Sequence, residues 1–125
     1  MRLVSSICHD TRDVQCVDTA NRGALADLAD TSVVETNCLI TGQGPVPLTV
    51  GHLPAQLRGL LQQVKAYEEL TVEAAVTGDR GIALQALIAN PIVPSVGVAK
   101  PLLEDLLTAH AEYLPQFKKR RGRAA

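Results

Sequence analysis

Residues 54–79 read PAQLRGLLQQVKAYEELTVEAAVTGD, and this stretch decides the fold because the spacing of apolar residues changes where it begins. Within it, apolar side chains recur every three or four residues, which is the period of an amphipathic helix. Pro54 suits the first position of a helix, and Gly78 suits the position just past its end. The sequence therefore predicts a long helix over residues 54–77. Its apolar face consists of Leu57, Leu60, Leu61, Val64, Leu70, Val72, Ala74 and Ala75.

Two shorter helices are expected after this one. Asp79 can cap a helix that closes at residues 90–91, because the residue before a proline avoids the helical conformation. Its inner face consists of Ile82, Ala83, Leu84, Leu87 and Ile88. Ser95 can cap a last helix, but Pro101 lacks the N–H that a helix interior needs, so we expect the regular part to start near Lys100. The inner face there consists of Ala99, Leu102, Leu103, Leu106, Leu107 and His110.

The residues before the long helix have the period of strands. Residues 14–18 alternate and stop at the turn Asn21-Arg22-Gly23, and the β-rich run 32–40 ends at residues 42–45 and is followed by residues 48–50. We interpret the second and third runs as a hairpin. Strands followed by helices predict an α+β fold, with a small antiparallel sheet and a helical C-terminal half.

The first residues have helical spacing at Leu3, Val4 and Ile7, and nothing before Leu3 can cap a helix. We therefore expect Met1 to lie inside an element and the domain to be truncated at its N-terminal side.

The composition is that of one globular domain. The 125 residues are 46% hydrophobic and 20% charged, which is typical of a chain with a single core. The net charge of −1 creates no field that would attract nucleic acid or an anionic membrane, and no stretch is long enough to span a membrane. Residues 118–125 are strongly basic, and we expect a disordered, solvated tail there rather than a nucleic-acid site.

The three cysteines are Cys8, Cys16 and Cys38. They form no CxxC pair and their number is odd, which suits reduced thiols in the cytoplasm. Cys8, His9 and Cys16 match no compact zinc spacing, so we predict no metal site among them.

Glu69 and Glu73 lie four residues apart on one helix face. Acid/base cleavage of a glycosidic bond needs a pair of carboxylates, but two acids on the same helix face cannot flank the bond from opposite sides. Lys65, one turn earlier, favours an ion-pair ladder in solvent. We predict no catalytic residue in this group.

The remaining polar patterns are interpreted as structural. His52 and His110 have no neighbouring nucleophile, so we assign them to a loop and a helix face. Gly42-Gln43-Gly44 lacks the third glycine or the lysine of a phosphate-binding loop, and Pro45 prevents a helix from starting there. The Asn21-Arg22-Gly23 turn could face a ligand cleft, and turn chemistry explains it equally well.

Several strings together resemble the C-terminal region of family 4 glycoside hydrolases. The central string is YEELTVEAAVTGD (67–79), and the supporting ones are NRGA (21–24), VVE (33–35), VG and LP (50–54), ALQAL (83–87), NP (90–91) with Pro94, and His110 with EYLPQF (112–117). Their order and spacing from Leu3 to Lys118 match the family, and the details resemble its 6-phospho-β-glucosidase branch. The chain departs from the family in lacking prolines at residues 24–30 and in having Gly97 and Pro101 in the last helix.

The resemblance implies that residues 1–117 form the C-terminal domain of a lactate dehydrogenase-like family 4 glycosidase. Such enzymes use NAD⁺ and Mn²⁺ to oxidise the sugar at C3, remove the C2 proton, eliminate the aglycone, and reverse these steps with water. The metal polarises the C3 ketone and the nicotinamide takes and returns the hydride. The family's dinucleotide fingerprint, metal-binding Cys and His, and catalytic Tyr lie upstream of the matched region. We therefore assign no catalytic, cofactor-binding or metal residue, and Tyr67 and Tyr113 receive no catalytic role.

We expect a C-terminal fragment of a glycosidase that cleaves 6-phospho-β-glucosides and is inactive alone. Its expected partners are a Rossmann-type N-terminal domain or upstream polypeptide and, in the intact enzyme, further copies of itself. The helix predicted at 54–77 is the candidate for these contacts, because its apolar face is wider than one small sheet need cover. The alternative is a stand-alone or split-enzyme interaction module.

Overall fold

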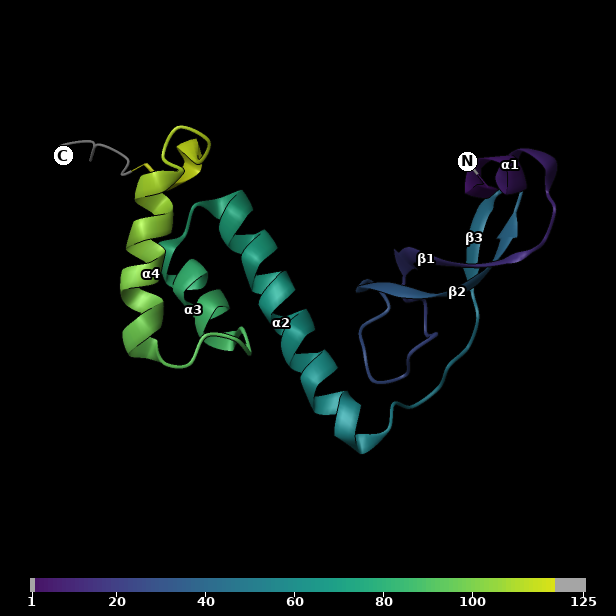
Figure 1. The fold of residues 1–125 in the computed structure, drawn as a ribbon, viewed down its shortest axis with the longest axis horizontal. Coiled ribbons are helices and arrows are strands. Elements are labelled where there is room, and N and C mark those ends of the chain that lie inside the picture. Colours follow the sequence, from purple (N-terminus) through teal and green to yellow (C-terminus); the bar gives the residue numbers. More distant parts are fainter. Residues whose placement is uncertain (1, 119–125) are drawn as a thin grey trace, which may run out of the picture. The chain divides into compact units, whose positions relative to one another are not determined.

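The computed structural model describes residues 2–118 and divides into two compact units, Met1–Arg58 and Gly59–Ala125. Figure 1 shows α1 and the sheet in the first part of the chain and the other helices in the second. The elements are α1 (Arg2–His9), β1 (Val14–Ala20), β2 (Val33–Thr41), β3 (Gly44–Pro47), α2 (Ala55–Thr77), α3 (Arg80–Ala89), α4 (Val96–Ala109) and a 3₁₀ turn, η1 (Pro115–Phe117). This architecture confirms the α+β prediction. The predicted tail begins at Lys118, and its residues 119–125 lie outside the described residues.

The three strands form one antiparallel sheet in the order β1-β2-β3. The third strand begins at Gly44, so the prediction that residues 48–50 form the returning strand was wrong. A two-residue turn, Gly42-Gln43, places Thr41 opposite Gly44, and the Thr41 hydroxyl donates to the Gly44 carbonyl at 2.9 Å. The two prolines of β3 are tolerated because this strand lies at the edge of the sheet.

One face of the sheet is buried and the other is open. In β2, alternate residues are buried, namely Val34, Thr36, Cys38 and Ile40. Val34 packs against Ala24 and Leu25 of the loop after β1, with Leu28 and Leu53 at the margin. The opposite face carries Val14, Val33 and Val46, each about half exposed. The core of this unit therefore lies between the sheet and the loop of residues 21–32.

The helical unit has a small core, to which α2, α3 and α4 each contribute one buried side chain. Ala74 of α2, Ala83 of α3 and Leu103 of α4 are buried together. Asp79 caps α3 as predicted, because its carboxylate accepts from the Gly81 and Ile82 N–H groups at 2.7 and 3.0 Å. The short side chains of the alanines let the helices approach closely.

The last helix starts earlier than the sequence predicts. α4 begins at Val96, directly after the Ser95 cap, whose hydroxyl accepts from the Val98 N–H, and it includes Pro101. The expectation of a start near Lys100 was wrong. Pro101 removes only the one hydrogen bond to the carbonyl four residues earlier, and that residue is Gly97, which has no side chain to crowd the ring.

Gly78 should tolerate no side chain. Its φ is +72°, and a Cβ built there would lie 2.1 Å from the Gln116 carbonyl oxygen of the C-terminal turn. We expect Gly78→Ala to destabilise the chain by at least about 1 kcal/mol, from the left-handed backbone alone. Gly59→Ala is the matched control, because a Cβ there meets nothing within 4 Å, and it should stabilise by about 0.5–1 kcal/mol. Urea unfolding of both variants measures the difference, and equal effects would contradict the close approach.

Candidate functional site

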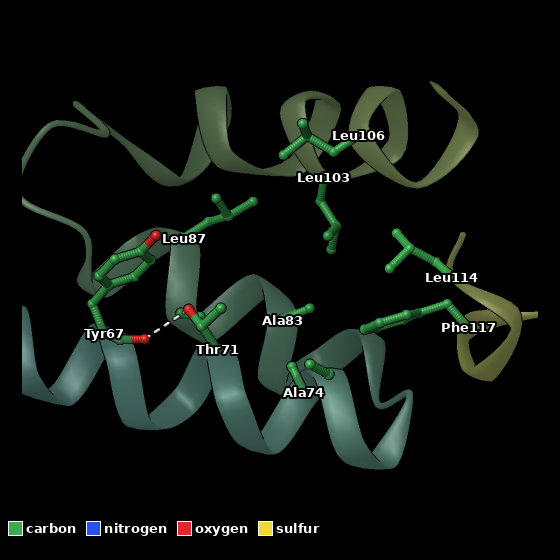
Figure 2. Close-up of a pocket in the computed structure, with 11 residues that line it drawn as sticks. Tyr67, Thr71, Ala74, Ala83, Leu87, Leu103, Leu106, Leu114 and Phe117 are labelled. Carbon is green, nitrogen blue, oxygen red and sulfur yellow. Dashed lines mark hydrogen bonds between the residues drawn. The ribbon is translucent and has the colours of Figure 1, made fainter. Parts of the chain in front are cut away.

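The helical unit contains an apolar pocket of about 260 Å³. Figure 2 shows Ala74 and Ala83 on one side and Leu103 and Leu106 on the other, with Phe117 from the C-terminal turn at one end. The full lining is Tyr67, Thr71, Ala74, Ala75, Ala83, Ala86, Leu87, Leu103, Leu106, Leu114 and Phe117. The pocket exists because alanines from α2 and α3 face leucines from α4 and leave space between them.

This pocket is suited to an apolar group and not to a charged one. The Thr71 hydroxyl is used by the Tyr67 backbone carbonyl, to which it donates at 2.8 Å (Figure 2). None of the lining residues carries a formal charge at neutral pH. A ring or branched aliphatic group would therefore be held by packing alone.

Asn21 organises the loop after β1. Its side chain is fully buried, its amide nitrogen donates to the carbonyls of Leu25, Leu28 and Ala29, and its oxygen accepts from the Leu25 N–H at 2.7 Å. Neighbouring Arg22 is exposed with φ +47°. Hydrogen bonds within the turn therefore use both polar atoms of the Asn21 side chain, and neither is left to bind a ligand.

A carboxylate and a histidine from distant parts of the chain meet in the sheet unit. Asp27 Oδ1 lies 3.0 Å from His52 Nδ1, and Oδ2 accepts from the Leu53 N–H at 2.6 Å. Arg58 lies 4.0 Å from the same carboxylate. The hydrogen bond with His52, followed by that from Leu53, holds the pKa of Asp27 below its usual value. This contact ties the loop to the segment that enters α2, and the outer edge of the imidazole is left in solvent.

The corner between α1 and β1 is strained and polar. Asp10 and Arg12 both have positive φ, at 47° and 57°, and Asp10 accepts from the Gly42 N–H at 2.8 Å. Asp13 accepts from Thr11 at 2.8 Å and from Arg2 at 3.1 Å. The Thr11 hydrogen bond is the main cause that lowers the pKa of Asp13 to about 2. The Asp10–Gly42 hydrogen bond joins the corner to the tip of the β2–β3 hairpin, and the Asp13 bonds join it to the start of α1.

Cys8 lies beside His9 in α1, whereas Cys16 and Cys38 lie on the paired strands β1 and β2. Cys8 and Cys16 are exposed, whereas Cys38 is buried in β2 and its thiol pKa is raised by burial. His9 Nδ1 lies 2.8 Å from the Ser5 carbonyl, within α1. Across residues 2–118, no three His, Cys, Asp or Glu side chains are placed to hold a metal ion.

The acidic face of α2 contains an ion pair between two residues that are three positions apart. Lys65 Nζ lies 2.5 Å from Glu68 Oε2, within the same helix. Glu73 has its backbone carbonyl bonded to the Thr77 hydroxyl, and Glu69 lies one turn before it on the same helix. Both glutamates are exposed and belong to one helix, so they do not flank a substrate from opposite sides.

The remaining candidates have structural places in their own units. Gly42 and Gln43 form the hairpin turn, and His110 is the residue that ends α4. Tyr67 lines the apolar pocket, and Tyr113 is 73% exposed. The sequence did not reveal the pocket or the Asp27–His52 contact, because both depend on segments far apart in the chain.

A comparison with known families and proteins identifies relatives along nearly the whole chain. Residues 1–93 match the model of the family 4 glycosyl hydrolase C-terminal domain, which confirms the predicted resemblance. A probable 6-phospho-beta-glucosidase of Bacillus subtilis (strain 168) is 53% identical over 115 residues, which cover 92% of this chain and 26% of that protein. This chain thus spans about a quarter of the length of the relative.

Solved structures agree with this match. A 6-phospho-alpha-glucosidase from gut microorganisms, in complex with NAD and glucose-6-phosphate, superposes with a TM-score of 0.88 at 39% identity, over 92% of this chain and 26% of that one. A 6-phospho-beta glucosidase of Thermotoga maritima, with manganese, NAD⁺ and glucose-6-phosphate, gives a TM-score of 0.83 at 33% identity, over 90% and 28%. Both confirm the predicted fold.

A carboxylate at position 21 should destabilise the sheet unit. In Asn21→Asp, a buried oxygen replaces the nitrogen that donates to three carbonyls, so we expect a loss of about 1–3 kcal/mol in the free energy of unfolding at neutral pH. Burial favours the neutral acid, so the loss should shrink as the pH falls. Asn37→Asp, at an exposed position of β2, should change stability by less than about 0.5 kcal/mol. Equal losses in urea unfolding would contradict this role of Asn21.

Asp13 should make folding sensitive to acid. Its folded pKa of about 2 lies below the ordinary value of 3.8, so it stabilises the fold above about pH 4, and this contribution is lost as the pH falls towards about 2. Asp13→Asn should reduce the pH dependence of unfolding in that range, whereas Asp105→Asn, at an exposed position of α4, should leave it in place. Urea titrations at several pH values measure this, and an unchanged slope in Asp13→Asn would disprove it.

Proposed function

Because the chain belongs to the family 4 glycosyl hydrolase C-terminal domain family, we propose that it is the C-terminal domain of an enzyme that cleaves 6-phospho-β-glucosides. The identity of 53% with a probable 6-phospho-beta-glucosidase, over 92% of this chain, carries the proposal. The domain would extend over residues 1–117, and the β-glucosidase branch is favoured over the α branch by the higher identity of that relative.

NAD and Mn²⁺ would be bound by other parts of the enzyme. Related structures contain NAD and manganese, and this chain corresponds to about a quarter of their length. Residues 2–118 offer no cluster of three metal-binding side chains, so they do not fit the metal. The chain would therefore supply no reacting group and would be inactive alone. Its partner would be the Rossmann-type N-terminal part of the enzyme.

The domain would contribute surfaces rather than chemistry. Its sheet has one open face, and α2 buries only one residue along its 23 residues. Surfaces of this kind need a partner, either the rest of the enzyme or a further copy. No helix within residues 2–118 is long and apolar enough to cross a membrane. We propose that the enzyme works in the cytoplasm, where its cysteines would stay reduced.

A stand-alone interaction module is the second candidate. The exposed apolar side chains of α2 favour it, since they offer a binding surface that requires no catalytic partner. The two candidates differ in whether the chain can replace the corresponding part of an active enzyme.

A chimera tests the proposed function. We expect that this chain, joined in place of the matching C-terminal quarter of the Bacillus subtilis relative, restores hydrolysis of a chromogenic 6-phospho-β-glucoside with NAD⁺, Mn²⁺ and reductant. The relative cut before the match is the control and should be inactive. This chain alone should also be inactive, because the proposal assigns the cofactor sites to the rest of the enzyme.

Two outcomes would decide against the proposal. A folded chimera that binds NAD but is as inactive as the truncated relative would favour the interaction module. Hydrolysis by this chain alone would show that a catalytic site exists within it and would overturn the assignment of chemistry to the rest of the enzyme.

A further inference from the structure

The apolar pocket of the helical unit has walls that do not close on one another. Apolar atoms that face an empty space lose the contacts that close packing provides. Four of the lining residues have side chains that end at Cβ and leave space before the leucines that face them, namely Ala74, Ala75, Ala83 and Ala86. The pocket therefore favours a group that has the size and polarity to fill it.

Polar contacts outside the pocket join its walls. One guanidinium nitrogen of Arg80 in α3 lies 2.5 Å from each carboxylate oxygen of Glu104 in α4. The Gln116 side chain of the C-terminal turn donates to the Ala75 carbonyl of α2 at 2.8 Å. Because Arg80, Glu104 and Gln116 do not line the pocket, these contacts are compatible with a filled pocket as well as an empty one.

The pocket opens to solvent along α2. Thr71 and Ala75 lie one turn apart on this helix, both line the pocket, and both are exposed. A small molecule can therefore enter without unfolding of the helices. A polar atom of that molecule can stay in contact with water at this opening while its carbon atoms are buried.

The size and charge of the pocket limit what can bind. A dry cavity of about 150 Å³ lined by leucine, isoleucine and phenylalanine is large enough for benzene. This pocket has about 260 Å³, which leaves room for a second fused ring. Only Tyr67 and Thr71 among its eleven lining residues have a polar side-chain atom, and both are neutral at pH 7. A charged ligand would lose its hydration without meeting an opposite charge.

The ends of the pocket favour an aromatic ring. The whole chain has three aromatic residues, and two of them, Tyr67 and Phe117, line this pocket. Figure 2 shows Tyr67 at one end and Phe117 at the other. Aromatic rings in edge-to-face or offset contact gain more than the area they bury would give. A flat ring between these two side chains can make such contacts at both of its ends.

The end of the chain itself does not suit the pocket. Residues 119–125 follow directly after the turn that carries Phe117, and they read KRRGRAA. Four of these seven residues are positively charged, and their only apolar side chains are two alanines. Burial of such charges against a neutral apolar lining is unfavourable. The occupant must therefore be a separate molecule.

We propose that this pocket is a binding site for a small, uncharged aromatic molecule of one or two rings. The ring lies between Tyr67 and Phe117, against the leucines and alanines of the three helices, and is held by packing. Any single polar atom of the ligand lies at the opening beside Thr71. This inference does not depend on the glycosidase assignment, because every lining residue lies in the helical unit.

NMR titration of the 125-residue chain with indole tests the site. Indole should bind saturably and give nuclear Overhauser effects to the rings of Tyr67 and Phe117. Tyr113 is the internal control, because it is 73% exposed and does not line the pocket, so it should give none. Indole-3-carboxylate has the same rings and a negative charge, and it should bind at least about tenfold more weakly.

Three results of this titration would overturn the proposal. They are the absence of saturable indole binding up to its solubility limit, contacts of indole with Tyr113 in place of Tyr67 and Phe117, and equal affinity for indole and indole-3-carboxylate. Because the titration uses the unaltered chain, it does not depend on whether a variant folds.

A matched pair of variants tests the location independently. Ala75 and Ala66 are both exposed residues of α2, but only Ala75 lines the pocket. Ala75→Leu should raise the dissociation constant of indole by about tenfold or more, because the added carbons occupy the space of the ligand. Ala66→Leu adds the same side chain to the same helix and should leave the constant unchanged. Equal affinities in a folded Ala75→Leu variant and in Ala66→Leu would place the binding elsewhere and overturn the proposal.

Discussion

The sheet unit depends on the buried amide of Asn21. A strand that ends in a loop leaves backbone carbonyls with no partner, and a buried carbonyl without a partner costs free energy. The Asn21 side chain supplies partners for three of them and for one N–H, so the loop can fold over the sheet. Leu25 is thereby placed against Val34, and Asp27 is held where His52 and Leu53 can reach it. Much of the unit's core thus follows from one polar side chain.

The helical unit is organised differently, by backbone and small side chains. Its buried core residues are mostly alanines, and its C-terminal turn packs against the end of α2 at a glycine. α2 meets the other helices closely at Ala74, which is its one buried residue among 23. Most of the helix surface therefore lies outside the core of this unit. Four large apolar side chains of α2 stay exposed, namely Leu57, Leu60, Val72 and Val76.

The sequence predicted those features that depend on neighbouring residues. The helical period, the Asp79 cap and the strand before Asn21 are local, and each was confirmed. The two errors came from competition that local rules do not resolve: the Ser95 cap outweighed Pro101, and a two-residue turn drew the prolines of β3 into the sheet. The apolar pocket and the Asp27–His52 contact join segments far apart in the chain, so no local pattern pointed to them.

The contact between Gly78 and the C-terminal turn also limits how this domain can change over evolution. The Gln116 carbonyl occupies the place where any other residue at position 78 would have its first side-chain atom, and the Gln116 side chain donates to the Ala75 carbonyl. A substitution at the end of α2 can therefore persist only together with a new path for residues 115–117. The two segments are nearly forty residues apart in the chain. We expect their amino-acid substitutions to occur together.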